Sequence, residues 1–177
     1  MADYHSPTVV TPELPVGDVT LLERMILGRV FFAPGQHDGL LHFAAPLIPE
    51  EFFPVSAGDL RAALSESIGA RSRIADVVRE LLAAHDTEPE ASRPQDIDVD
   101  LTGSDIGWHD ILQEIVRRSV SLDEIVVWTA FTCTRMRDDG FGGSVTRITA
   151  GAIQYASTDQ ALADMRNAPT AFDIGRG

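Results

Sequence analysis

The chain has 177 residues, 44% of them apolar, which is enough for one hydrophobic core and little for a second. Its 27 acidic residues outnumber 14 basic ones, giving a formal net charge of −13. This charge argues against direct binding to nucleic acid or to an anionic membrane and suits a protein partner with a basic surface. All 14 basic residues are arginine, which excludes Schiff-base and phosphate-loop lysines.

Three further observations bear on the cellular compartment. The first residues lack the basic and apolar regions of a secretory signal. No apolar run approaches the roughly 20 residues that span a bilayer. Cys133 is the only cysteine, so an internal disulfide is excluded, which fits a reducing compartment. We expect a cytoplasmic protein without a cofactor.

The first third of the chain predicts a tail, a helix and a hairpin. Residues 1–17 contain three prolines and no apolar period, which predicts a flexible N-terminal tail. A capping pair and helical spacing predict a helix over residues 20–28, ended by Gly28. Two strand-like runs, residues 29–34 and 40–46, then predict a hairpin around "GQHDG".

The middle of the chain predicts two helices and an acidic strand. Ser56 precedes one helix, and Ser72 precedes the clearest amphipathic helix in the sequence. Residues 86–95 are polar and contain prolines, which is typical of a linker. Residues 96–101, "DIDVDL", alternate acidic and apolar side chains, which predicts a half-buried strand with an acidic outer face.

The last third predicts a helix, two long strands and a final helix. Ser104 is the expected cap of the first helix. Residues 125–137 and 144–156 are rich in β-branched and aromatic residues and predict strands. The final helix begins at Ser157 or Thr158, before a flexible C-terminal tail. Because most strands come as adjacent hairpins, the sequence predicts an α+β fold: a single domain over residues 18–167, with a mainly antiparallel sheet built from hairpins, helices packed on one face, and a tail over 168–177.

The stretch "RMRDDGFGGSV" connects the two long strands. A phosphate-binding loop needs a following helix and, in most classes, a lysine. Here a strand follows and lysine is absent, so the stretch predicts a hairpin turn. Phe141 at its tip either packs back on the sheet or is an exposed contact residue.

One hairpin carries candidate metal ligands. His37 and Asp38 lie in its turn and His42 on the returning strand, so the three could meet at a metal ion. Their spacing matches no recurrent zinc motif, and ordinary surface histidines are the alternative.

The most acidic segment runs from residue 86 to residue 110, where eight acidic residues face Arg93 alone. Along a strand, alternate carboxylates lie roughly 7 Å apart, close to the phosphate repeat of a nucleic-acid strand. Such a row could imitate nucleic acid towards a basic protein, whereas a solvated strand face that protects a sheet edge is the plain alternative. The candidate partner-binding residues are Asp86, Glu88, Glu90, Asp96, Asp98, Asp100, Asp105, Asp110 and Phe141.

Residues 115–153, "IVRRSVSLDEIVVWTAFTCTRMRDDGFGGSVTRITAGAI", resemble a stretch of uncharacterised proteins from proteobacterial mobile elements. The phrase "FTCTRMRDDGFGG" carries most of the similarity. The resemblance implies a mobile-element setting, in which small acidic proteins often inhibit host nucleases, and it assigns no catalytic residue.

These observations lead to one expectation and two alternatives. We expect a non-enzymatic acidic module that binds a protein with a basic surface, as an inhibitor that mimics nucleic acid. A small metal-dependent enzyme built on His37, Asp38 and His42 is the first alternative. A structural homo-oligomer, with the C-terminal hairpin as its interface, is the second.

Overall fold

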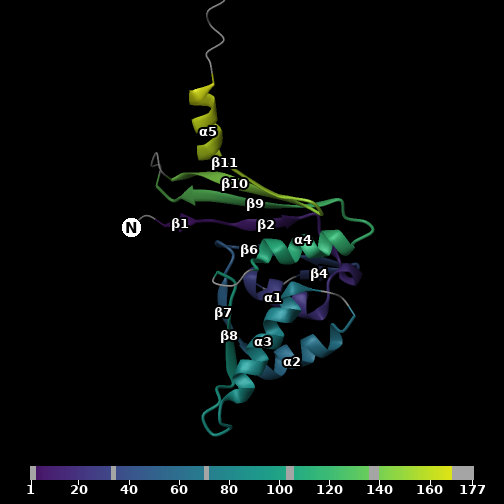
Figure 1. The fold of residues 1–177 in the computed structure, drawn as a ribbon. Coiled ribbons are helices and arrows are strands. Elements are labelled where there is room, and N and C mark those ends of the chain that lie inside the picture. The colour runs from purple at the N-terminus through teal and green to yellow at the C-terminus, as the bar shows by residue number, and fades with distance from the viewer. Residues whose placement is uncertain (1–2, 33–34, 70–71, 103–105, 136–139, 169–177) are drawn as a thin grey trace, which may run out of the picture.

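An antiparallel six-stranded sheet forms one layer of the protein (Figure 1). The computed structural model describes residues 3–32, 35–69, 72–102, 106–135 and 140–168. The strands follow the order β11–β10–β9–β2–β6, and β1 also pairs with β9. Their bounds are β1 Tyr4–His5, β2 Thr8–Thr11, β6 Ala44–Ala45, β9 Glu124–Cys133, β10 Phe141–Thr149 and β11 Ile153–Ser157.

Two smaller sheets accompany the large one. Strands β3 (Leu14–Pro15), β5 (Leu40–His42) and β4 (Gly35–His37) form the first. Strands β7 (Phe52–Ser56) and β8 (Asp96–Asp100) form the second. All pairings are antiparallel.

Four helices lie on one side of the large sheet and the fifth rises from the other (Figure 1). Helix α4 is nearest the sheet, where the Gln113 amide donates to the Thr149 carbonyl at 3.0 Å. The helices are α1 Leu21–Val30, α2 Ala57–Glu66, α3 Arg73–Thr87, α4 Trp108–Arg118 and α5 Thr158–Asn167, with a 3-10 turn at Val16–Asp18.

The hydrophobic core lies between the large sheet and α4 and continues among α1–α3 and the β7–β8 sheet. The sheet contributes Val10, Val127 and Ile148, and α4 contributes Ile111 and Ile115, all of them buried. Burying this apolar surface is the main favourable term in folding. The predicted α+β domain with a mainly antiparallel sheet is confirmed.

Several predicted elements form as expected. Thr20 and Glu23 form the capping box of α1, and the Ser56 and Ser157 side chains cap α2 and α5. Strand β8 buries Ile97 and exposes its aspartates. The buried Cys133 ends β9.

The N-terminal tail prediction is wrong for the described part of residues 1–17. Strand β2 pairs with β9 in register Val10↔Val127, and Val10 and Leu14 are buried. The prolines permit this because strand β2 ends before Pro12. The C-terminal tail prediction concerns residues 168–177, of which 169–177 lie outside the described residues.

The strand predicted over residues 29–34 is also wrong for its described part, residues 29–32. Helix α1 continues through Gly28 to Val30, because Leu22, Ile26 and Val30 form one buried face. The hairpin's first strand is β4, and its turn residues Asp38 and Gly39 both have positive φ, as a two-residue type I′ turn requires.

The strand predicted over residues 144–156 is two strands. A turn at Ala150–Gly151 separates β10 from β11, and the Thr149 N–H donates to the Ala152 carbonyl at 2.9 Å. The α4 cap predicted at Ser104 lies outside the described residues, and α4 begins at Trp108.

Candidate functional site

The acidic segment divides into paired and unpaired carboxylates. Asp86, near the end of α3, forms an ion pair with Arg61 of α2. A second guanidinium, that of Arg93, lies 3.8 Å from the same carboxylate. These contacts join neighbouring parts of the fold, so Asp86 acts mainly in local structure.

Asp110 is likewise held by structural contacts, at the start of α4. It accepts hydrogen bonds from the Gly107 N–H at 2.9 Å and from the Arg73 guanidinium at 2.8 Å. Partial burial of the carboxyl raises its pKa, but these hydrogen bonds lower it more, so the pKa of Asp110 lies below its usual value. Asp105 lies outside the described residues.

The three aspartates of β8 lie on one exposed face of the two-stranded sheet. Between them, Ile97 and Val99 point into the core and are 8% and 0% exposed, which fixes the direction of the carboxylates. Asp96 and Asp98 accept no hydrogen bond and form no ion pair within the described part of the chain. Asp100 accepts hydrogen bonds from the Thr102 N–H and hydroxyl at 2.8 and 2.7 Å.

The neighbouring strand adds apolar surface to this row. Phe52 of β7 lies opposite Asp100, and Pro54 lies opposite Asp98. Both are exposed, Phe52 by 54%. Because directly opposed residues point to the same side of a sheet, aromatic and acidic side chains form one surface, which we call the acidic face: Phe52, Pro54, Asp96, Asp98 and Asp100.

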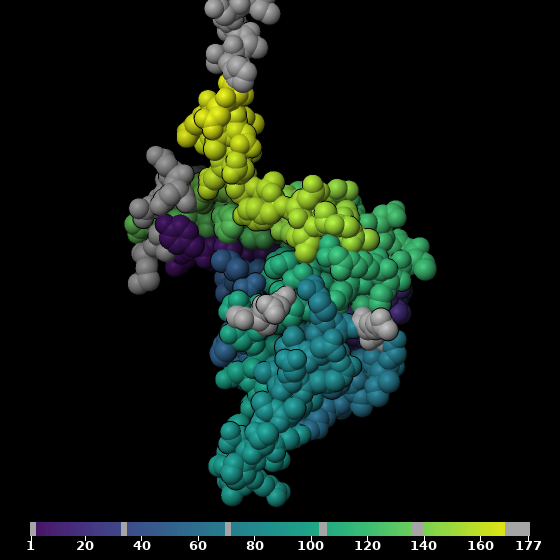
Figure 2. Space-filling view, in the orientation of Figure 1, coloured from purple at the N-terminus to yellow at the C-terminus, as the bar shows by residue number. Residues whose placement is uncertain are grey.

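Two further predicted contact residues lie near this sheet in the chain. Glu88 and Glu90 are exposed in the connection between α3 and β8. That connection forms the lower tip of the molecule in Figures 1 and 2. Both residues therefore extend the negative surface beyond the strand.

Phe141 does not belong to the acidic face. It lies on β10 of the six-stranded sheet, opposite Thr132, and is 53% exposed. Phe141 and the aspartates of β8, predicted to belong to one contact surface, therefore lie in different sheets. Phe141 is therefore exposed and not packed back on the sheet, and its role as a contact residue stays a prediction.

The histidine hairpin does not assemble a metal site. The His37 imidazole lies 3.1 Å from the Asp38 carboxylate, whereas His42 lies 3.6 Å from Glu13. All four side chains are about half exposed or more. Among the described residues, no three His, Cys, Asp or Glu side chains are placed to hold a metal ion.

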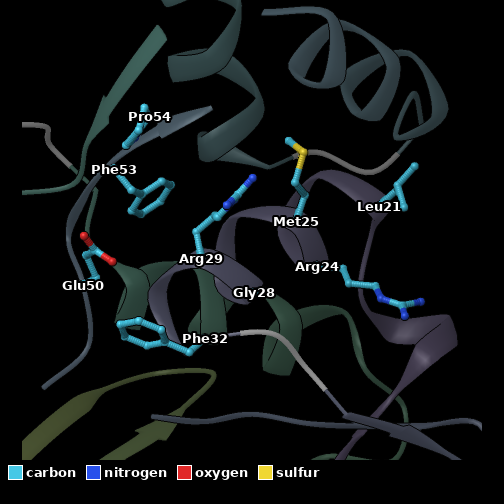
Figure 3. Close-up of a pocket in the computed structure, with 9 residues that line it drawn as sticks. All are labelled: Leu21, Arg24, Met25, Gly28, Arg29, Phe32, Glu50, Phe53 and Pro54. Carbon is cyan, nitrogen blue, oxygen red and sulfur yellow. The ribbon is translucent and has the colours of Figure 1, made fainter. Parts of the chain in front are cut away.

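A groove that sequence reasoning missed runs along the outer face of α1. It has a volume of about 730 Å³ and is lined by apolar side chains that include Met25, Phe32 and Phe53 (Figure 3). Phe32 has φ of +50°, a conformation that is costly for a bulky residue. The sequence feature that could have indicated this groove is Gly28. It lines the groove, and a glycine within a helix leaves the helix surface there without a side chain.

Two arginines border this groove without ion partners among the described residues. Figure 3 shows the Arg29 guanidinium reaching over the groove and that of Arg24 pointing away from it. The two cations therefore do not converge on a common anionic group. The groove offers an apolar surface rather than an arrangement of catalytic groups.

Comparisons with protein-family models, with curated proteins and with solved structures found no match for the chain. Among the described residues, no helix is long and apolar enough to cross a membrane.

Proposed function

We propose that this protein is a non-enzymatic binding module whose acidic face contacts a basic surface on another protein. One observation carries the proposal: Asp96 and Asp98 are exposed and lack ion partners among the described residues, and they lie on a strand fixed by pairing with β7. Asp86 and Asp110, by contrast, are paired with arginines. Unlike those two side chains, Asp96 and Asp98 therefore present uncompensated negative charge on one ordered strand.

The spacing on β8 favours a partner that binds nucleic acid. Alternate residues of a strand lie roughly 7 Å apart on one side, which approximates the spacing of phosphates along a single strand. Exposed Phe52 beside the row supplies an apolar contact of the kind that protein interfaces favour. In this proposal the module is a cytoplasmic inhibitor that occupies a nucleic-acid site, a role that would suit the mobile-element setting expected from the sequence.

A charge-reversal pair tests the proposal. The probe is an arginine-rich peptide that binds duplex DNA, and its affinity is measured by titration calorimetry. The test variant is Asp96→Lys/Asp98→Lys. The matched control, Glu66→Lys/Asp123→Lys, changes two exposed carboxylates elsewhere and produces the same net charge.

We expect the test variant to lose at least tenfold in affinity, and the control to lose much less. Binding by the unmodified protein should weaken as salt rises and should be competed by a short DNA duplex. Equal losses in both variants would mean that net charge alone attracts the peptide, and the proposal would be wrong.

A further inference from the structure

Helix α5 stands on the large sheet without a covering layer (Figure 1). None of its residues is buried by the described part of the chain. Leu162 is 45% exposed and Met165 73% exposed. A ten-residue helix is only marginally stable in water unless its apolar face is packed, so α5 lacks the contact that a helix of this length requires.

Three apolar residues of α5 form, together with Thr158, one stripe that begins in a groove. Thr158, Ala161, Leu162 and Met165 follow the spacing i, i+3, i+4 and i+7, which places them on one side of a helix. Thr158 and Ala161 also line a groove of about 410 Å³ at the foot of α5. The apolar surface therefore extends from the groove along α5, away from the sheet.

The floor of this groove is formed by the outer face of the large sheet. Trp128, Ala130, Val145 and Ala156 line it, and Trp128 is 50% exposed. Apart from Trp128 these side chains are small or short, which leaves room for bulky side chains from outside. The groove and the stripe together form an L-shaped apolar surface.

The charges around this surface favour a second copy of the chain as its occupant. None of the groove-lining residues carries a formal charge, although the chain carries −13. Arg147 and Glu124, on the same face of the sheet, neutralise each other at 2.7 Å. The groove lining therefore adds no like charge against an acidic copy, and it offers no uncompensated carboxylate to a basic partner.

The charged residues on α5 fit the same occupant. Asp159 and Arg166 lie seven residues apart and so share one flank of the helix. Neither forms an ion pair within the described part of the chain. When two copies of α5 pack antiparallel about a twofold axis, Arg166 of each copy lies beside Asp159 of the other, because such an interface is self-complementary.

We propose that two copies of this chain associate through antiparallel α5 helices. Leu162 of each copy packs near the twofold axis, and Met165 of each reaches towards the groove at the foot of the other copy's α5. The helix is about 15 Å long. A helix pair of this length buries too little surface by itself for a stable interface, which needs roughly 1,200 Å². The dimer therefore also requires that the end of each helix covers the sheet of the other copy.

Sedimentation equilibrium of the full chain tests this proposal. We expect a mass twice the 19.2 kDa of one chain, a shift to the monomer mass for Met165→Glu, and no shift for Ala163→Glu. Ala163 lies on the opposite side of α5, so this control adds the same charge to the same helix. Because Met165 is 73% exposed, its replacement leaves the core of the monomer intact.

A charge swap identifies the antiparallel arrangement. Asp159→Arg alone and Arg166→Asp alone should each weaken the dimer, and the double variant should restore it. Failure of the double variant to recover association would exclude this arrangement. A single monomer mass at about 100 µM, well above the Kd of a micromolar interface, would overturn the proposal. The α5 surface would then bind a different protein.

The acidic face and the α5 surface are separable. Asp96→Lys/Asp98→Lys should leave the dimer unchanged, and Met165→Glu should leave the intrinsic affinity for the basic peptide unchanged. Each proposal can therefore fail without the other.

Discussion

The Glu23 carboxylate on α1 accepts a 2.6 Å hydrogen bond from the Arg118 guanidinium on α4, and the Glu23 side chain is fully buried. The same carboxylate oxygen accepts the Thr20 N–H at 3.0 Å, which completes the capping box of α1. One side chain therefore both begins a helix and links it to the helix beneath the large sheet.

Removing the arginine should destabilise the protein strongly. Arg118→Met leaves a buried carboxylate with one backbone hydrogen bond, and loss of one partner of a buried pair costs about 3 kcal/mol or more. The free energy of unfolding from urea titration measures this effect.

The double variant Glu23→Leu/Arg118→Met is the informative control. One oxygen of Glu23 and one nitrogen of Arg118 are buried without a hydrogen-bond partner among the described residues, so the pair is incompletely satisfied. We expect the double variant to recover much of the loss. Additive losses would contradict this view of the pair.

Asp110 should make stability depend on pH. Its pKa is lower in the folded protein than its usual value, so ionised Asp110 stabilises the fold above the unfolded-state pKa. That contribution is lost as the pH falls through the lower, folded-state value. Replacing Asp110 with Asn should therefore cost stability near pH 7 and cost progressively less as the solution is acidified below about pH 4.

Urea titrations of both proteins across this pH range measure the effect. Asp123→Asn, at an exposed position, serves as the control and should cost little at any pH. A constant difference between wild type and Asp110→Asn at all pH values would show that the carboxylate contributes nothing through its charge.

Gly143 is predicted to be intolerant of substitution. A Cβ atom at this position would lie 2.9 Å from the Thr129 backbone oxygen on the neighbouring strand, and backbone cannot move aside cheaply. We expect Gly143→Ala to destabilise the protein by about 1–3 kcal/mol, as overpacking does. Gly151→Ala, where a Cβ atom meets nothing within 4 Å, should cost much less. Urea titration of both variants measures the two free energies of unfolding, and equal costs would contradict the prediction.

The aspartate row should oppose folding at low salt. Two charges about 7 Å apart in water repel by roughly 0.5 kcal/mol. Because Asp98 has such a neighbour on each side, Asp98→Asn should raise the free energy of unfolding by up to about 1 kcal/mol at low ionic strength. The gain should vanish in 1 M salt, where such charges are screened. A loss of stability at low salt would show that Asp98 has a structural partner.

Sequence reasoning succeeded where the signal was local. The alternation that buries Ile97 and exposes Asp98 lies within five residues, and the Ser157 cap lies directly before α5. Both patterns follow from backbone geometry and need no distant partner.

Prediction from sequence failed where the residue that determines the structure is far away in the sequence. Strand β2 exists because Val10 pairs with Val127 on β9, and nothing near Val10 reveals this. Helix α1 passes Gly28 because Val30 is buried, and such burial outweighs the roughly 1 kcal/mol cost of a glycine. The arginine that neutralises Asp110 lies 37 residues earlier, so the acidic segment looked more uniform than it is.

The central claim is that the acidic face is the surface that binds a basic partner. The most direct test is a titration of the ¹⁵N-labelled protein with the arginine-rich peptide, followed by amide chemical-shift mapping. We predict that the largest shifts occur at Phe52, Asp96 and Asp98 and on the strands around them. Shifts spread over all acidic surfaces, or concentrated away from β7 and β8, would contradict the claim.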